Sequence, residues 1–296
     1  MTPSVIVTGA AGFIGSAVVA YLRRNGYSVL PLGRERGDVA EPAYWDALPG
    51  ADHVIHLAGR SYVPDSWKVP ADFYAANVVG TARAAEYCRR TKAHLMFVSS
   101  YVYGTPHHLP IGENHPISPG SPYALSKVLA EQVCAFHAET ERLPVTVVRP
   151  FNIFGPGQRS DFLIAAIIDQ IRQGSAIQVK DLAPRRDYLF IEDLAAGLER
   201  MMQAPAGLRT YNLGAGSSHS VQDVIDLAQD VAGTHLAIEC TAAPRKNEIA
   251  DVRADTTLAR THLGWTPRIS LREGLAMMLD DRAARSRAFK TSGMTP

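Results

Sequence analysis

The sequence predicts an α/β protein built on a doubly wound parallel sheet, followed by a smaller mixed α/β part. Two observations carry this prediction. Short apolar runs alternate with helix-length segments in the first half of the chain, and a glycine-rich turn follows the first run. After Pro150 the alternation becomes irregular, with isolated strand-like runs between helical patterns.

The predicted strands of the sheet are five apolar runs, at residues 4–8, 27–32, 53–58, 94–100 and 144–149. Helix-length segments such as 71–91 and 122–142 lie between them. Because the runs are apolar almost throughout, both faces of the sheet must be covered, which is typical of parallel sheets.

In the second half, helices are predicted near residues 160–173, 192–203, 220–232 and 269–284. We expect residues 1–150 to form the sheet domain and residues 151–296 to form mainly the smaller one, with segments near 187–232 returning to the first. The tail 285–296 lacks apolar periodicity, and we expect it to be frayed.

Composition argues against several classes of function. The 296 residues are 46% hydrophobic and 20% charged, and the formal net charge of +1 gives no electrostatic reason to expect nucleic acid or a membrane surface as a partner. The longest apolar run, 162–168, is too short to cross a membrane, and we see no signal peptide. Three scattered cysteines favour a reduced, cytoplasmic protein, and the histidine spacing predicts no metal site.

The glycine-rich turn lies between the first strand and the first helix. Gly9, Gly12 and Gly15, with Phe13 and Ile14 before the last of them, give the spacing G-x-x-G-x-x-G. Glycines here allow a tight turn and a close approach of the backbone to a pyrophosphate at the helix N-terminus. The turn therefore predicts a Rossmann-type dinucleotide-binding domain in residues 1–150, which leaves residues 151–296 mainly for substrate binding.

The end of the second strand bears on the choice of dinucleotide. An acid usually holds the adenosine ribose there, but this chain has Gly33 followed by Arg34. Glycine leaves room for a bulkier group, and an arginine suits a phosphate, so the pair favours NADP(H). In the alternative, Arg34 is a solvated loop residue, Glu35 or Asp38 takes the ribose, and the cofactor is NAD(H).

Tyr123 and Lys127 form a candidate catalytic pair. They lie four residues apart at the start of an amphipathic helix, so both side chains lie on one face. A lysine ammonium beside a phenol lowers the pKa of the phenol, and such a tyrosine can protonate a carbonyl oxygen or deprotonate an alcohol.

At this point the chain resembles the extended short-chain dehydrogenases/reductases, the epimerase/dehydratase type of enzyme that modifies nucleotide sugars. The matching motifs run in the family's order from residue 8 to about 267: TGAAGFIG, GDV, HLAG, NVVGT, VSSYVYG, PYALSK, RPFNIFGPGQ, RRDYLFIEDL, YNLG and LGWTP.

The resemblance implies a role for each matching residue. Counting back from Val102 makes Ser99 the hydrogen-bond donor to the reacting oxygen, with Ser100 as the alternative because the short motif leaves the register open. Tyr123 is the acid/base, and Lys127 lowers its pKa and holds the nicotinamide ribose. The other residues that the resemblance places at the cofactor are Asp38, Val39, Leu57, Ala58, Gly59 and Asn77, the last of which could instead cap a helix break.

On the substrate side, the resemblance points to Asn152 at the sugar diphosphate and to Arg186 and Arg245 at its two phosphates. Ser100 and Tyr101 stand where the dehydratases of the family carry Asp-Glu, which argues against a 4,6-dehydratase.

The expected function is an NADP(H)-dependent reductase of a nucleotide-activated 4-keto-6-deoxy sugar, with hydride transfer at C4. A sugar-nucleotide 4-epimerase uses the same residues and is the alternative. A non-catalytic dinucleotide-binding regulator is the rival from another class, although such proteins typically lose the Tyr or Lys. The family's habit of pairing helices favours a homodimer.

Overall fold

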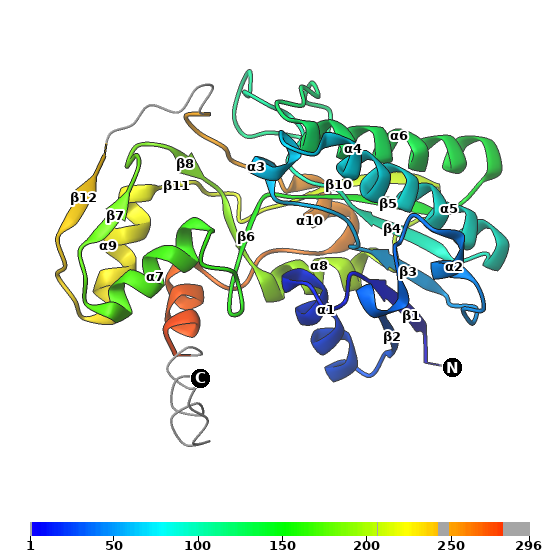
Figure 1. Cartoon of the computed structure of the whole chain (residues 1–296), viewed down its shortest axis with the longest axis horizontal. Helices are drawn as coiled ribbons and strands as arrows, with labels where there is room; N and C mark the ends of the chain where they lie inside the picture. The colour runs from blue at the N-terminus through cyan, green and yellow to red at the C-terminus, as the bar shows by residue number, and fades with distance from the viewer. Residues whose placement is uncertain (1, 206, 242–248, 281–296) are drawn as a thin grey trace.

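A six-stranded parallel sheet forms the centre of the larger half of the molecule (Figure 1). The computed structural model describes residues 2–205, 207–241 and 249–280. In spatial order the strands are β10 (Leu208–Leu213), β5 (Val145–Pro150), β4 (His94–Val98), β3 (His53–His56), β1 (Ser4–Thr8) and β2 (Ser28–Leu32). The five predicted strands are confirmed, and β10 adds the sixth along the outer edge of β5.

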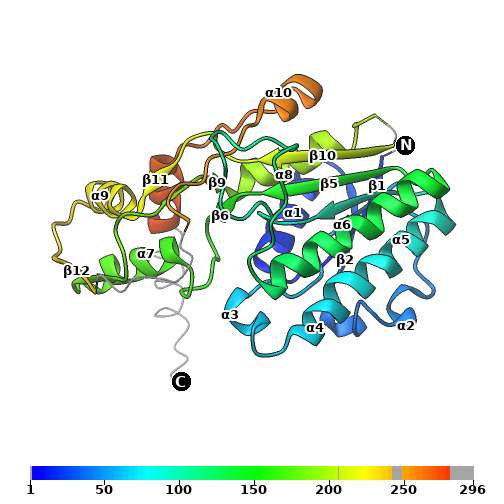
Figure 2. The same cartoon turned by 90° about the horizontal axis from the view of Figure 1, so that it is seen from above.

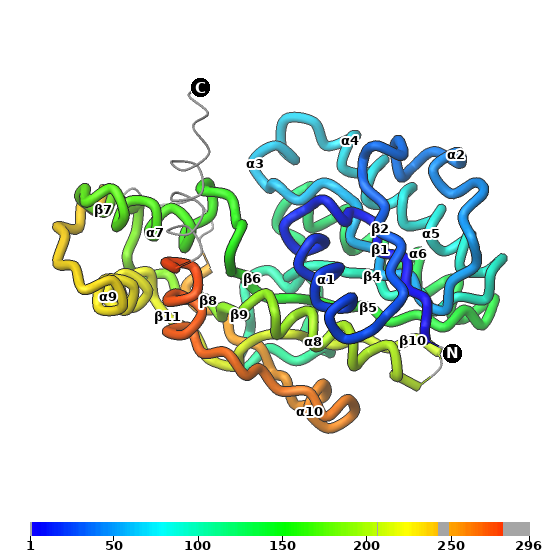
Figure 3. Tube along the Cα trace, turned by 90° about the horizontal axis from the view of Figure 1, so that it is seen from below, coloured from blue at the N-terminus to red at the C-terminus, as the bar shows by residue number. Residues whose placement is uncertain are grey.

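Helices cover both faces of this sheet, so the doubly wound architecture is confirmed. Figures 2 and 3 show α1 (Phe13–Arg24) and α8 (Ile191–Met201) on one face, and α5 (Gly80–Thr91) and α6 (Pro122–Glu141) on the other. Each face has its own apolar core, which includes Val18, Leu22 and Leu198 on the first face and Tyr87 and Ala130 on the second.

The order of the strands reverses beside β1. From β1 the chain goes to β2 on one side and then to β3 on the other, with Ser4–Thr8 paired to both neighbours. The turn after β1 and the turn after β3 therefore lie next to each other at the carboxyl edge of the sheet. In open parallel sheets this edge is the place where ligands bind.

The helical stretch before β4 contains an irregularity that the sequence did not predict. Where a single helix was expected over 71–91, the structure has α4 (Pro70–Tyr74), a π-helical turn η2 (Ala75–Val79) and then α5. A π turn adds one residue to the helical ladder and is often found at functional sites. Here it contains Asn77, which is buried.

The smaller half surrounds a separate apolar core that includes Phe154, Ile168, Ile225 and Leu275. Its helices are α7 (Leu163–Gln173), α9 (Val221–Ala232) and a helical segment over 271–280. Its short strands pair as β6 (Asn152–Phe154) with β9 (Tyr188–Phe190), β7 (Ile177–Val179) with β12 (Ile238–Cys240), and β8 (Arg185–Arg186) with β11 (His219–Ser220). The remaining elements are η1 (Arg34–Arg36), α2 (Pro42–Trp45), α3 (Val63–Ser66) and α10 (Thr257–Leu263).

One carboxylate joins the segments that run between the two halves. Asp187, which is fully buried between β8 and β9, accepts hydrogen bonds from the backbone N–H groups of Ala215 (2.6 Å), Gly216 (3.0 Å) and Ala254 (3.0 Å). Its carbonyl oxygen accepts a further bond from Asn152 N at 3.0 Å. Burial raises the pKa of Asp187 to about 6, although the three N–H groups act in the opposite direction. The domain boundary at residue 150 stays a prediction.

Two expectations of the sequence concern a membrane-spanning helix and a metal site, and the described residues contain neither feature. They contain no helix that is long and apolar enough to cross a membrane, and no cluster of three or more His, Cys, Asp or Glu side chains that could hold a metal ion. Residues 281–284 of the predicted last helix and the tail 285–296 lie outside them.

Candidate active site

The turn between β1 and α1 is built so closely that two of its glycines admit no side chain. A Cβ atom on Gly15 would lie 2.1 Å from the carbonyl oxygen of Gly9, and one on Gly9 would lie 2.8 Å from Ala58 N. Gly9 also has φ +68°, which favours glycine. Gly12 precedes α1 and provides no side-chain cap for its first turn. The residues therefore fit the pyrophosphate of a dinucleotide, which needs a bare backbone at a helix N-terminus.

The wall opposite this turn is held by Thr8 at the end of β1. Its hydroxyl oxygen accepts hydrogen bonds from Leu57 N (3.2 Å) and Ala58 N (3.1 Å) and lies 2.9 Å from His56 Nδ1. Since Thr8 already accepts two bonds, its proton goes to His56, whose Nδ1 must be unprotonated. Burial lowers the pKa of His56 to about 3, so this histidine stays neutral. His56 was not predicted as a site residue, although it is the first residue of the HLAG motif and directly precedes Leu57.

At the end of β2 the structure gives a mixed result for the predicted phosphate pocket. Arg34 is exposed, as a phosphate ligand would have to be. The carboxylate of Glu35, however, accepts a hydrogen bond from Gly33 N at 2.9 Å, and a Cβ on Gly33 would lie 2.2 Å from its Oε2. Arg36 donates to the carbonyl oxygens of Tyr44 and Asp46, both at 2.6 Å. The space beside Gly33 is therefore filled by an acid of the chain itself.

Asp38 and Val39, expected at the adenine, have local contacts. An Asp38 carboxylate oxygen accepts a bond from Ala40 N at 2.9 Å, and Val39 is buried. Their contact with a cofactor stays a prediction.

Asn77 joins the β3 turn to the helix that carries Tyr123. Its Oδ1 accepts a hydrogen bond from Arg60 N (2.8 Å), and its Nδ2 donates to Arg60 O (3.0 Å) and Ser126 Oγ (2.8 Å). These three hydrogen bonds of the Asn77 side-chain amide position Gly59 and Arg60 against α6.

The helix α6 positions Tyr123 and Lys127 one turn apart, as predicted. Ser121 caps the helix by accepting a bond from Ala124 N at 3.1 Å, and Pro122 is its first residue. Lys127 Nζ donates to the carbonyl oxygen of Val98 at 2.9 Å and lies 4.8 Å from the centre of the Phe97 ring. Burial lowers the pKa of Lys127 to about 8.

The pKa of Tyr123 differs from the sequence expectation. Burial raises it above its ordinary value of 10.0, and only a side-chain hydrogen bond with Ser100 acts in the opposite direction. Phe73 contributes to this burial, since its ring packs against the Tyr123 ring with centroids 6.3 Å apart. In the described structure the Lys127 ammonium group donates to Val98 O, and it makes no contribution to this shift. That Lys127 lowers the pKa of the phenol during the reaction stays a prediction.

The two serines after β4 have different surroundings. Ser100 acts to lower the pKa of Tyr123, against the effect of burial. Ser99, the serine chosen by counting back from Val102, is buried, and its hydroxyl has no hydrogen-bond partner. Ser100, the alternative register, is thus the serine that acts on the Tyr123 phenol, and the choice between the two serines stays a prediction.

The predicted substrate residues are partly brought together. Burial raises the pKa of Tyr101 and of Tyr188 to about 12, and the Arg186 charge acts in the opposite direction on both, so it lies near both phenols. It also donates to Ile249 O at 2.7 Å. Asn152 Nδ2 donates to Asp187 O at 3.1 Å. Arg245 lies outside the described residues, and a contact of these side chains with a diphosphate stays a prediction.

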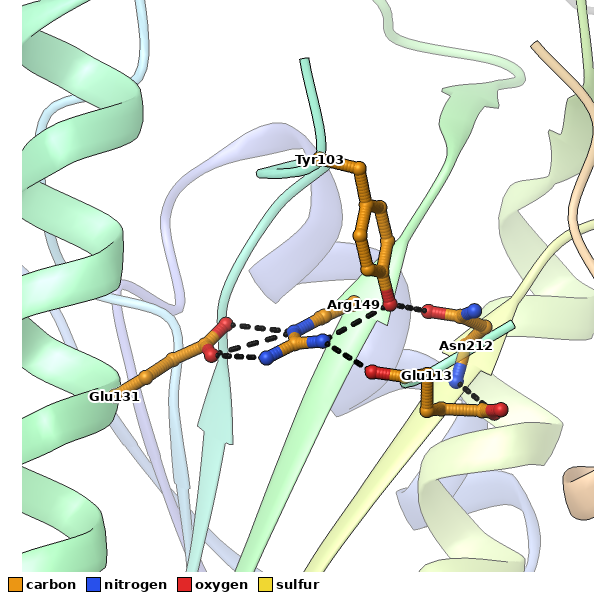
Figure 4. Close-up of polar contacts among 5 residues, drawn as sticks. All are labelled: Tyr103, Glu113, Glu131, Arg149 and Asn212. Atoms are coloured by element: carbon orange, nitrogen blue, oxygen red, sulfur yellow. Dashed lines mark hydrogen bonds and ion pairs between the residues drawn. The ribbon is translucent and has the colours of Figure 1, made fainter. Parts of the chain in front are cut away.

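A polar network that sequence reasoning missed lies deeper along α6 (Figure 4). It joins Glu131 and Arg149 with Tyr103, Glu113 and Asn212. Arg149 opens the RPFN motif, but the motif was read only for its asparagine. A groove of about 400 Å³ is lined by Glu131, Arg149 and neighbouring residues of α6, β5 and β10, and neither Tyr123 nor Lys127 lines it.

The family model for NAD-dependent epimerases/dehydratases matches residues 5–214 of this chain, which include the glycine turn, Ser100, Tyr123 and Lys127. The chain belongs to this family. Its members are the extended short-chain dehydrogenases/reductases that act on nucleotide sugars, as the motifs predicted.

Two curated relatives have different activities. A GDP-6-deoxy-D-mannose reductase from Pseudomonas aeruginosa is 33% identical over 305 residues, covering 97% of this chain and 99% of the relative. A UDP-glucose 4-epimerase from Mycolicibacterium smegmatis is 30% identical, covering 93% of this chain and 97% of the relative. Among solved structures, RMD from P. aeruginosa complexed with NADPH has a TM-score of 0.88 and 32% identity, covering 96% of this chain and 100% of that one.

Replacing each serine tests the register. Because Ser100 is the serine that lowers the pKa of the phenol, Ser100→Ala should lower turnover by about 100-fold, the usual loss of one positioned donor to a developing oxyanion. Ser99→Ala is the matched control, and it should change turnover little. Steady-state rates of both variants give the comparison, and the opposite ranking would return the role to Ser99.

Proposed function

We propose that this chain is an NADP(H)-dependent reductase that converts the C4 carbonyl of a nucleotide-activated 4-keto-6-deoxy sugar into a hydroxyl. The observation that carries the proposal is the placement of Tyr123 and Lys127 one turn apart on α6, with the Lys127 ammonium group fixed on Val98 O. Burial keeps the pKa of the Tyr123 phenol above its ordinary value. A protonated phenol is the form that a ketone reduction requires, since the carbonyl oxygen must gain a proton.

In this mechanism, the chain's residues act on the carbonyl oxygen. Ser100 and Tyr123 donate hydrogen bonds to it and polarise the C4 carbonyl. NADPH, when bound, supplies the hydride that C4 receives. As C4 becomes tetrahedral, the Tyr123 proton moves to the oxygen and leaves a phenolate, which the Lys127 ammonium stabilises. A proton from solvent then restores the phenol, so one ketone, one hydride and one proton become one alcohol.

The relatives support the reductase over other chemistry in the family. The P. aeruginosa relative is named a GDP-6-deoxy-D-mannose reductase and aligns over nearly the full length of both chains. The structure of RMD from the same organism contains NADPH. The dehydratase reading stays disfavoured in either serine register, because neither Ser100–Tyr101 after Ser99 nor Tyr101–Val102 after Ser100 is an Asp-Glu pair.

A 4-epimerase is the second candidate, favoured by the M. smegmatis relative and by the contact of Glu35 with Gly33. Such an acid suits the free ribose of NAD(H). An epimerase would oxidise C4 with Tyr123 as the base and return the hydride to the other face.

Two assays separate these candidates. The reductase, run in reverse, should reduce NADP⁺ in the presence of GDP-6-deoxy-D-mannose, with the absorbance at 340 nm as the readout. The epimerase should instead convert UDP-glucose with no net change in the dinucleotide. Mass analysis of nucleotide released from freshly purified protein adds an independent test, because tightly held NAD favours the epimerase.

Tyr123→Phe removes the proton donor but keeps the ring that packs against Phe73. We expect turnover to fall by about 100-fold or more while the Kd of NADPH changes only a few-fold, since general acid catalysis contributes about that much. Turnover near that of the wild type would exclude Tyr123 from the mechanism.

We propose that NADP(H) is preferred to NAD(H), on the strength of exposed Arg34 and the absence of a side chain at Gly33. A 2′-phosphate would bind where the Glu35 carboxylate now accepts the Gly33 N–H bond. When NADP(H) binds, the 2′-phosphate would then replace the Glu35 carboxylate beside Gly33, and Arg34 would supply a cation to pair with the phosphate.

Arg34→Ala should weaken NADP(H) by about 10- to 150-fold, the loss of one charge-assisted contact of about 1.5–3 kcal/mol, and should spare NAD(H). Glu35→Gln should strengthen the binding of NADP(H), because it removes a negative charge that competes with the 2′-phosphate for the space beside Gly33. Dissociation constants for both cofactors at one fixed salt concentration give the answer. Equal weakening of both cofactors by Arg34→Ala would contradict the pocket.

We also propose a homodimer formed through α6. Leu125 and Phe136 on this helix are large apolar side chains that are 38% and 60% exposed, and the matching helix of a second copy would cover them. Phe136→Asp should weaken the dimer tenfold or more, because burying a phenylalanine contributes about 1.5–3 kcal/mol. Phe162→Asp, on the loop before α7, is the control. Sedimentation equilibrium at several concentrations measures both, and a wild-type monomer would end the proposal.

A further inference from the structure

The catalytic helix carries a third charged residue on the face of Tyr123 and Lys127. Glu131 follows Lys127 by four residues, as Lys127 follows Tyr123, so the three side chains lie along one line of α6. Both Lys127 and Glu131 are buried, at 6% and 8% exposure. A carboxylate one turn from a buried ammonium group is in a position to pair with it.

Glu131 pairs with Arg149 of β5 instead (Figure 4). Arg149 Nε donates to both carboxylate oxygens, at 3.0 and 3.2 Å, and Nη2 donates to Oε2 at 2.6 Å. The two side chains are only 7% and 10% exposed, which reduces the screening of their charges by water.

The remaining donor of the guanidinium is fixed by the loop that follows β4. Arg149 Nη1 donates to Tyr103 Oη at 3.0 Å and to the carbonyl oxygen of Glu113 at 3.1 Å. Tyr103 in turn donates to Asn212 Oδ1 on β10 at 2.6 Å. Since Tyr103 lies three residues after Ser100, this network ties α6 to the loop that carries the serine.

The other titratable groups near Lys127 are neutral around pH 7. His56 on β3 has its pKa lowered to about 3, and burial raises the pKa of Cys134 on α6 far above its usual range. Among the described residues that influence Lys127, Glu131 is therefore the charged one, and its charge is balanced by Arg149.

We propose that the Glu131–Arg149 ion pair is a positioning device: it keeps the ammonium group of Lys127 on Val98 O and within reach of Tyr123, and it sets the charge around that group. This inference deepens the proposed reductase and rests on it for its catalytic meaning. Glu131 and Arg149 are positioning residues, since neither contacts Tyr123 in the described structure.

The proposal predicts opposite effects for the two members of the pair. Glu131→Gln removes the carboxylate and leaves the Arg149 cation unbalanced, so the pKa of Lys127 should fall further below 8. Arg149→Met leaves the carboxylate with Lys127 as its nearest cation, so the pKa of Lys127 should rise. Each shift should be about one unit or more, as expected for a single charge at short range.

NMR titration of protein with ¹³C-labelled lysines measures this pKa without any substrate. The chain has six lysines, and Lys127 is identified by its loss in Lys127→Arg. The double variant Glu131→Gln/Arg149→Met should lie between the two single variants. Glu86→Gln, which breaks the exposed Arg83–Glu86 pair on α5, is the control and should leave the Lys127 pKa unchanged.

Glu131→Asp and Arg149→Lys keep the charges and guard against loss of the fold, which circular dichroism monitors. Both should keep the Lys127 pKa near the wild-type value. A Lys127 pKa that is the same in every folded variant would overturn the proposal, and the Glu131–Arg149 pair would then only stabilise the fold. Shifts of the predicted signs in a protein without reductase activity would uphold it and refute the proposed function instead.

Discussion

The arrangement of the site depends on the ion pair and hydrogen bonds of the buried Arg149 guanidinium. A charge removed from water is tolerated only where a counter-charge and hydrogen-bond acceptors surround it. Glu131 supplies the charge, and Tyr103 and the Glu113 carbonyl supply the acceptors. Because these groups come from a helix and from two places in one long loop, satisfying one cation fixes three pieces of the chain against the sheet.

The cofactor side of the site is built on the opposite principle, the removal of side chains and charges. Gly9 and Gly15 bring backbone against backbone, and His56 stays neutral between Thr8 and the aromatic rings of Trp45 and Phe97. A bare and uncharged wall leaves the phosphates of a dinucleotide as the dominant charges there.

Much of this could be predicted from sequence, because apolar strands, glycine turns and helical spacing are local signals. The five strands, the glycine turn and the pairing of Tyr123 with Lys127 follow from such patterns. What the local patterns left open depended on contacts across the fold. The serine register turned on one residue of loop length, the pKa of Tyr123 on burial behind Phe73, and the room beside Gly33 on how Glu35 folds back. The Arg149 network was missed because its members share no motif, and two of them, Tyr103 and Asn212, are more than a hundred residues apart in the sequence.

The hydrogen bonds of Asp187 have a consequence for how such proteins can be recombined. This one residue touches the chain where it leaves β5, where it leaves β10 and where it approaches α10. The segments that follow β5 and β10 and the segment that precedes α10 are thereby tied to the segment that carries Asp187. A chimera that exchanged the smaller half for that of a relative would have to transplant residues around 152, 187, 215 and 254 as one block. Grafts with a single junction after β5 would leave a buried carboxylate facing amide groups of foreign geometry.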